Sequence, residues 1–195
     1  MSLFGCGSTE TVDLLEKYSG FNQHKVPHVM QDTHWDCGLA CVAMILGGVN
    51  ITACLEDLTN QCAVESIWTI DLAYLLHHYM THFTYYTSYF GSRKEYQQDS
   101  FYQATFDQDE LRVNHLFDTA RRSGIHVEKH LMDVPGYLGY DQAGDKFIYR
   151  DPATSQGYCA ISTKDLDQAR QAEGTDHDWY VEQTEWQADW DWGGL

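Results

Sequence analysis

The chain has few basic residues. Its 195 residues include 12 Lys and Arg against 29 Asp and Glu, for a formal net charge of −17, and the sequence pI is about 4.7. Proteins that bind nucleic acid need clustered Lys and Arg, which displace counterions from the phosphate backbone. The composition therefore argues against nucleic acid as a partner.

Long apolar runs and a leader segment are lacking as well. No apolar run approaches the roughly 20 residues of a membrane-spanning helix. Residues 1–6 (Met-Ser-Leu-Phe-Gly-Cys) have neither the basic start nor the apolar core of a signal peptide. The six cysteines are scattered, and free thiols are the usual state of cysteine inside the cell. We therefore expect no membrane association and a location in the cytoplasm or the nucleus.

The sequence contains no phosphate-binding loop. Residues 5–7 (Gly-Cys-Gly) are followed neither by the third glycine of a dinucleotide fingerprint nor by Gly-Lys-Ser/Thr. His78 and His82 are one helical turn apart, but the other ligands of a zinc site at tight spacing are missing. We expect neither a cofactor nor a metal.

The stretch around Cys37 carries the strongest signal in the chain. Residues 38–46 are mostly apolar with helical spacing, and a glycine pair ends the run. Because Asp36 is a good N-cap residue, Cys37 is predicted in the first turn of a buried helix. There the unpaired N–H groups and the helix dipole favour the nucleophilic thiolate. Gln31, six residues upstream, could direct its side-chain N–H at charge developing on a substrate oxygen.

A purely structural interpretation of these cysteines stands beside the catalytic one. Cysteine is among the most buried residue types, and on an apolar helix it commonly fills space, as Cys41 is expected to do. Cys37 and Cys41 do not have the Cys-x-x-Cys spacing of a redox site. A thioredoxin-like role is therefore not expected.

Two families share these motifs. Residues 31–41 resemble the start of papain-like peptidases of the bacteriocin-processing type, in which the cysteine after the aspartate is the nucleophile and the upstream glutamine builds the oxyanion hole. A closer resemblance is to the guanylyl cyclase domain-containing protein family, through residues 34–41 (His-Trp-Asp-Cys-Gly-Leu-Ala-Cys) and 66–75 (Ser-Ile-Trp-Thr-Ile-Asp-Leu-Ala-Tyr-Leu). It extends over most of the chain, roughly residues 26–178, with shorter matching blocks at residues 100–102, 110–117, 151–153 and 174–176.

The resemblance assigns three catalytic residues. It implies that Cys37 is the nucleophile and that Gln31 contributes to the oxyanion hole. Asp151, which follows a predicted strand and precedes a proline, matches the residue that orients the catalytic histidine.

The catalytic histidine itself has no counterpart. In the family it stands in a Gly-His-(Phe/Tyr) motif on an apolar strand, and the matching position here is Asp133. Pro135 and Gly136 make the surrounding stretch a poor strand. His126 and His130 lie nearby in the sequence and are alternative bases.

The resemblance also implies a longer segment between Val127 and Tyr140 than this chain possesses. A deletion, as in a splice form or a divergent paralogue, would explain the difference. Such a loss removes a central strand together with the general base, so that activation of the nucleophile is compromised.

The remaining pattern predicts an α+β domain, because helices come first and strands later. We expect helices over residues 9–18, 37–46, 51–60, 72–79 (capped by Asp71), 107–123 and 162–172, and strands over residues 83–90, 125–128, 146–149, 158–161 and 179–181. The predicted organisation is an N-terminal extension (residues 1–25), a papain-like domain (residues 26–182) and an acidic, Trp-rich tail (residues 183–195). The tail is either a frayed terminus or a segment that docks into a basic, apolar groove of a partner.

We therefore expect a papain-like fold, with the Cys37 helix followed by an antiparallel sheet from which a strand is missing, and a cysteine site that is inactive or impaired. One alternative is guanylyl cyclase activity, the conversion of GTP to cyclic GMP that the family name implies. It would need carboxylates that hold metals, and the candidates, which more often have structural roles, are Asp36, Asp71, Asp145 and Asp151. Another alternative is a non-catalytic interaction module for an unidentified protein or peptide.

Overall fold

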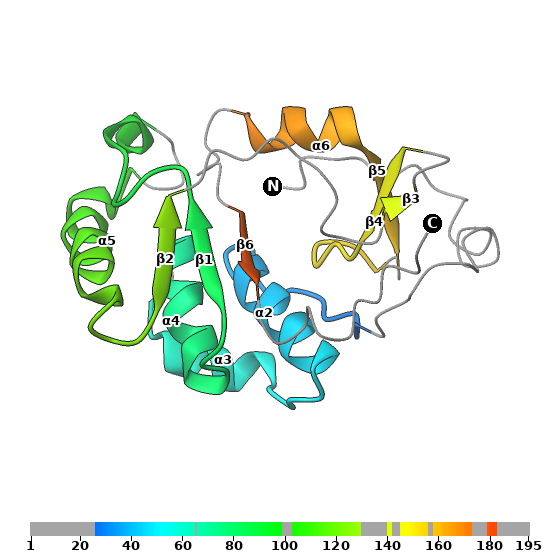
Figure 1. Ribbon diagram of the computed structural model, residues 1–195, viewed down its shortest axis with the longest axis horizontal. Helices are drawn as coiled ribbons and strands as arrows, with labels where there is room; N and C mark the ends of the chain where they lie inside the picture. Colours follow the sequence, from blue (N-terminus) through cyan, green and yellow to red (C-terminus); the bar gives the residue numbers. More distant parts are fainter. Residues whose placement is uncertain are drawn as a thin grey trace, which may run out of the picture. The chain divides into compact units, whose positions relative to one another are not determined.

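In the described chain three α-helices come before the first strand, and the other five described strands all follow residue 120, so that helices come first and most strands later, as the sequence predicts. The computed structural model describes residues 26–64, 66–98, 103–129, 140–141, 145–155, 158–172 and 179–182. These residues belong to two compact units, Met1–Glu65 with Met132–Glu173 and Ser66–Leu131 with Gly174–Leu195. Figure 1 shows their helices and strands.

The first unit is organised around the predicted cysteine helix. Helix α2 spans Cys37–Gly48, buries the side chains of Leu39, Val42 and Leu46 among others, and contacts α3 (Leu55–Cys62). Three antiparallel strands form a sheet in the order β3 (Tyr140–Asp141), β4 (Lys146–Tyr149) and β5 (Cys159–Ser162). Helix α6 (Thr163–Arg170) follows β5 directly (Figure 1). The predicted pairing of residues 146–149 with residues 158–161 is therefore confirmed, with β5 shifted by one residue.

An extended segment, residues 26–31, precedes α2 in this unit. Pro27 contacts Gly47 near the end of the helix so closely that a Cβ atom built on that glycine would lie 2.3 Å from the proline Cγ. The backbone N–H of Gln31 donates to the carbonyl oxygen of Pro152 at 2.9 Å. The segment therefore contacts both α2 and the stretch that follows β4.

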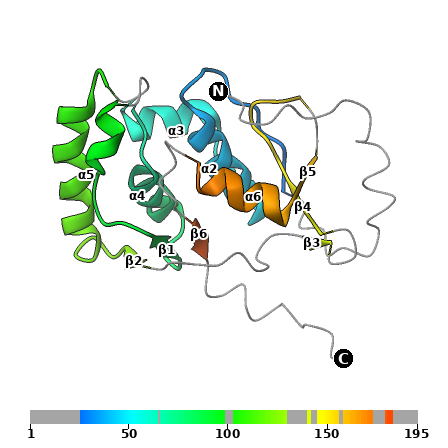
Figure 2. The same cartoon turned by 90° about the horizontal axis from the view of Figure 1, so that it is seen from above.

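The second unit contains the other helices and a mixed sheet. Its elements are α4 (Thr69–Tyr79), β1 (Thr84–Thr87), the 3-10 helix η1 (Lys94–Gln98), α5 (Phe106–Ala120), β2 (His126–Lys129) and β6 (Trp179–Glu182). The strand order is β2-β1-β6, in which β1 is parallel to β2 and antiparallel to β6. Figure 2 shows α4 beside α5 and both near β1 and β2. Where the sequence led us to expect antiparallel strands, this sheet includes one parallel pair.

A buried ion-pair network joins α4 to α5. The guanidinium of Arg112 bonds the carboxylate of Asp71 and donates at 2.9 Å to both the carboxylate of Asp109 and the carbonyl oxygen of Ser66. Asp71 caps α4 from a different position than predicted: the N-cap residue is Trp68, and Asp71 is the third residue of the helix, from which its carboxylate accepts the N–H of Trp68 at 2.8 Å as in a capping box. Burial acts to raise the pKa of Asp109, but hydrogen bonds from Ser66, Thr105 and Arg112 prevail and hold that pKa below its usual range.

Several predictions lie outside the described residues, namely the helix over residues 9–18, the stretch around Asp133 and the tail. The papain-like fold and the division at residues 25 and 182 stay predictions. Within the described ranges, no helix combines the length and apolarity that crossing a bilayer requires.

Candidate functional site

Cys37 lies where the sequence predicts, at the first residue of α2, and its side chain is exposed. The first turn of the helix carries no acidic residue. Asp36 occupies the N-cap position but does not cap the helix. Its buried carboxylate instead accepts the backbone N–H groups of Asp32 at 3.1 Å and Thr33 at 2.9 Å. The aspartate thus stabilises the loop before the helix and makes no side-chain bond at the helix start, where Cys37 lies.

Gln31 and Asp151 lie in the same unit as Cys37. The backbone hydrogen bond from Gln31 to Pro152 brings Gln31 next to the residue that follows Asp151, although the two stretches are far apart in the sequence. The carboxamide of Gln31 donates to the carbonyl oxygen of Thr33 at 2.6 Å, so this N–H is engaged within the loop. The Asp151 carboxylate accepts the N–H of Ala153 at 2.9 Å.

The charge of Asp151 acts on α2. Burial raises the pKa of the Cys41 thiol to about 12, and the negative charges of Cys37 and Asp151 add to that rise. Since Cys41 is one helical turn after Cys37, Asp151 lies within electrostatic range of the start of the helix. The described residues therefore bring Cys37, Gln31 and Asp151 into one region, whereas their catalytic roles stay predictions.

The candidate histidines are distributed differently. His126 is in the second unit, where its Nε2 lies 2.7 Å from a carboxylate oxygen of Glu128 and its side chain is 61% exposed. His130 and Asp133 lie outside the described residues. Across the part of the chain that the structure describes, no histidine is hydrogen-bonded to the sulfur of Cys37.

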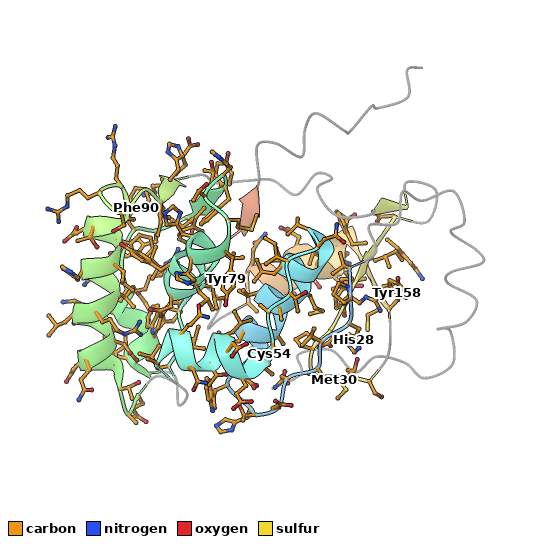
Figure 3. The ribbon with its side chains drawn as sticks, turned by 90° about the horizontal axis from the view of Figure 1, so that it is seen from below. His28, Met30, Cys54, Tyr79, Phe90 and Tyr158 are labelled. Carbon is orange, nitrogen blue, oxygen red and sulfur yellow. The ribbon has the colours of Figure 1, made fainter. Side chains whose placement is uncertain are left out.

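Sequence analysis missed one histidine in this region. The Nε2 of His28 lies 3.0 Å from the carbonyl oxygen of Asp151, and the contact is partly buried. Figure 3 shows His28 on the extended segment that leads to α2. The available signal was its place three residues before Gln31, on a segment that Pro27 keeps extended.

The carboxylates considered as metal ligands have other partners. Asp36 and Asp71 accept the bonds described above, Asp145 accepts the hydroxyl of Thr163, and Asp151 accepts the N–H of Ala153. Among the residues with described positions, no group of three or more His, Cys, Asp and Glu is arranged to hold a metal ion.

Comparisons with known proteins identify relatives. The model of a family described as "Guanylylate cyclase" matches residues 26–136 and 137–181. The protein "Guanylyl cyclase 1" of Arabidopsis thaliana is 35% identical over 201 residues, a match that covers 78% of this chain and 73% of that protein. No solved structure matches.

The family match bears on the segment that the sequence predicts to be short, and the Arabidopsis match shows that this chain lacks positions its relative has. The two matched parts of the family meet between Gly136 and Tyr137, with no residue of this chain between them. Since 78% of 195 residues is about 152, some 49 positions of the 201-residue match have no counterpart here. The junction falls between Val127 and Tyr140, where the resemblance implies the missing segment.

Proposed function

We propose that this chain, which belongs to the guanylylate cyclase family, is a papain-like protein that keeps a cysteine-hydrolase type of site without the ability to turn over substrate. The observation that carries the proposal is the common location of Cys37, Gln31 and Asp151. An exposed cysteine at a helix start, a glutamine just upstream and an aspartate after a strand are the parts that the resemblance calls for. Peptides or acylated proteins would be the class of ligand.

The arrangement supplies half of the required chemistry. A carbonyl carbon attacked by the sulfur of Cys37 would develop negative charge on its oxygen close to the N–H groups at the start of α2. The carboxamide of Gln31 would contribute a further N–H if it turned away from Thr33.

The second half of the chemistry is proton transfer. A cysteine peptidase needs an imidazole to accept the thiol proton and then to donate it to the leaving amine. An ionised Asp151 cannot donate that proton, and without an imidazolium between them its charge disfavours the thiolate form of a nearby cysteine. The division of the family match between residues 136 and 137, where the family's histidine strand is expected, supports the loss of the base.

The proposal is tested with the full chain and a library of fluorogenic peptide and isopeptide substrates. We expect stoichiometric alkylation of Cys37 by iodoacetamide and no turnover above that of the Cys37→Ala variant. Insertion of a Gly-His-Phe strand before Gly139 should create turnover that depends on Cys37 and Asp151. Robust turnover by the unmodified chain, abolished by Cys37→Ala, would overturn the proposal.

A second candidate is guanylyl cyclase activity, which the printed names of the family and of the Arabidopsis relative favour. The test is incubation of the chain with GTP and Mg²⁺ or Mn²⁺, with cyclic GMP measured by mass spectrometry. Formation of cyclic GMP that survives Cys37→Ala and is abolished by Asp36→Asn or Asp71→Asn would replace the cysteine-site proposal. If the chain forms no cyclic GMP with either Mg²⁺ or Mn²⁺, the hypothesis of guanylyl cyclase activity is wrong.

A further inference from the structure

The extended segment before α2 is fastened to the stretch after β4 by three hydrogen bonds. The guanidinium of Arg150 donates to the carbonyl oxygen of Val26 at 2.9 Å. The Nε2 of His28 lies 3.0 Å from the carbonyl oxygen of Asp151. The backbone N–H of Gln31 donates to the carbonyl oxygen of Pro152 at 2.9 Å. Of the three, only the second is a side-chain contact to Asp151 itself.

We propose that His28 is a positioning residue of the cysteine site: its imidazole holds the main chain of Asp151 and thereby keeps that carboxylate beside the start of α2. The inference rests on the proposed function, because it concerns the same site. His28 would act through Asp151 and would not itself exchange protons with a substrate.

The long-range contacts made by residues 151 and 152 go through their carbonyl oxygens. Pro152 has no backbone N–H and so offers no donor with which to fasten this stretch. The carbonyl oxygen of Asp151 accepts the N–H of Thr154 at 3.3 Å within the local turn and also contacts His28, and the carbonyl oxygen of Pro152 accepts the N–H of Gln31. Since a carbonyl oxygen can only accept, the Nε2 of His28 is the donor in this contact.

The carbonyl and the carboxylate of Asp151 share one Cα atom. A fixed carbonyl group therefore limits the directions in which the carboxylate can point. The N–H of Ala153 fixes the direction further, because it donates to Oδ1 of Asp151 at 2.9 Å. The Ala153 contact is local to residues 151–153, whereas the His28 contact reaches across 123 positions of sequence. His28 therefore connects the carboxylate to the segment that carries Gln31 and continues into the helix of Cys37.

A matched control histidine is available. His34 is exposed and lies on the same approach to α2, three residues before Cys37, and the described part of the chain gives it no hydrogen bond. A general effect of removing an imidazole near the cysteine would appear on His34→Ala as well. An effect through Asp151 would appear only on His28 variants.

The experiment measures the coupling between Asp151 and Cys37 with and without His28. The rate of Cys37 alkylation by iodoacetamide is followed by mass spectrometry in the full chain and in the isosteric variant Asp151→Asn. Loss of the negative charge should speed alkylation by about 2- to 5-fold, since an ionised carboxylate in range disfavours the thiolate. The same pair of rates is then measured in three backgrounds, His28→Ala, His28→Gln and His34→Ala.

In the His28→Ala background we expect Asp151→Asn to change the alkylation rate of Cys37 by less than about 1.3-fold. A carboxylate that is no longer held is exposed to solvent, where its charge is screened. His28→Gln should restore the effect, since the glutamine amide N–H replaces the Nε2–H donor, and His34→Ala should leave it unchanged. If His28→Ala does not fold, His28→Phe supplies similar volume without a donor and is compared with His28→Gln.

The outcomes separate the two claims. An Asp151→Asn effect of equal size in all backgrounds overturns the role of His28 and leaves the proposed site intact. No effect of Asp151→Asn in the parent chain overturns both, because Asp151 would then not act on Cys37. Failure of His28→Gln to restore an effect lost in His28→Ala or His28→Phe also overturns the inference, since the donor would not be what matters.

Discussion

Replacement of Arg112 by methionine should cost the second unit much of its stability at neutral pH. The guanidinium compensates two buried carboxylates, those of Asp71 and Asp109, and also donates to a carbonyl oxygen. Removing one partner of a buried ion pair typically costs about 3–5 kcal/mol, because the remaining charge stays buried without compensation. The Arg112 side chain is 26% exposed, so solvent screens part of the interaction, and we expect a loss of about 2–4 kcal/mol.

The pH dependence of this loss follows from the carboxylates. In the parent chain the hydrogen bonds from Ser66, Thr105 and Arg112 outweigh burial and lower the pKa of Asp109. A carboxyl group with a lowered folded pKa stabilises the fold above its unfolded value of about 3.9, and that contribution is lost as the pH falls through the folded value. Burial already raises the pKa of Asp71 in the parent chain, against the opposing effect of Arg112. Without Arg112 the pKa of Asp71 rises further and that of Asp109 rises as well, so that protonation favours the folded state as the pH falls.

The difference in the free energy of unfolding should therefore shrink between pH 7 and pH about 4. Urea denaturation at several pH values measures it, with Arg122→Met, at an exposed position of the turn after α5, as the matched control. A cost below about 1 kcal/mol at pH 7, or one that does not change with pH, would show that the network contributes no more than a surface ion pair.

Three further predictions concern the core, the cysteine and the extended segment. Leu75→Ala should cost about 2–5 kcal/mol in urea denaturation because Leu75 is 5% exposed, whereas a cost below about 0.5 kcal/mol would place that face of α4 on the surface. Cys37 should be alkylated faster than any other thiol, which peptide mapping after brief exposure to iodoacetamide will show, and faster reaction elsewhere would contradict its placement. Gly47→Ala should destabilise the fold by about 1–3 kcal/mol, because its Cβ would lie 2.3 Å from Pro27, and Gly48→Ala, with its nearest contact at 3.3 Å, should cost clearly less in the same thermal melt.

Periodicity accounts for the elements that the sequence predicted well. The apolar spacing and the glycine pair defined α2 to within two residues, and the residues of β4 agree with their prediction. Helix α5 and strands β1, β2 and β5 appear at their predicted places with shorter or shifted bounds. Local sequence is sufficient in these cases because the spacing of apolar and polar residues within a short window predicts which positions are buried.

The direction of side-chain bonds was less predictable. Asp36 and Asp71 are typical capping residues, yet the first bonds the loop before its helix and the second occupies the third helical position. In both cases a carboxylate near a helix start has several N–H groups within reach, and the surrounding packing decides among them. The parallel pairing of β1 with β2 is likewise made possible by α5, which connects the two strands in the sequence, and no pattern within either strand predicts it.

The candidate site illustrates the same division between local and long-range information. Gln31 and Cys37 are six residues apart, and a motif is enough to associate them. Asp151 lies 114 or more positions further along the chain, and the segment around His28 contacts residues 150–152 through hydrogen bonds that follow no periodic pattern. One segment therefore carries the glutamine, leads to the cysteine helix and contacts the stretch of the aspartate, so the site depends on long-range contacts that no local motif predicts.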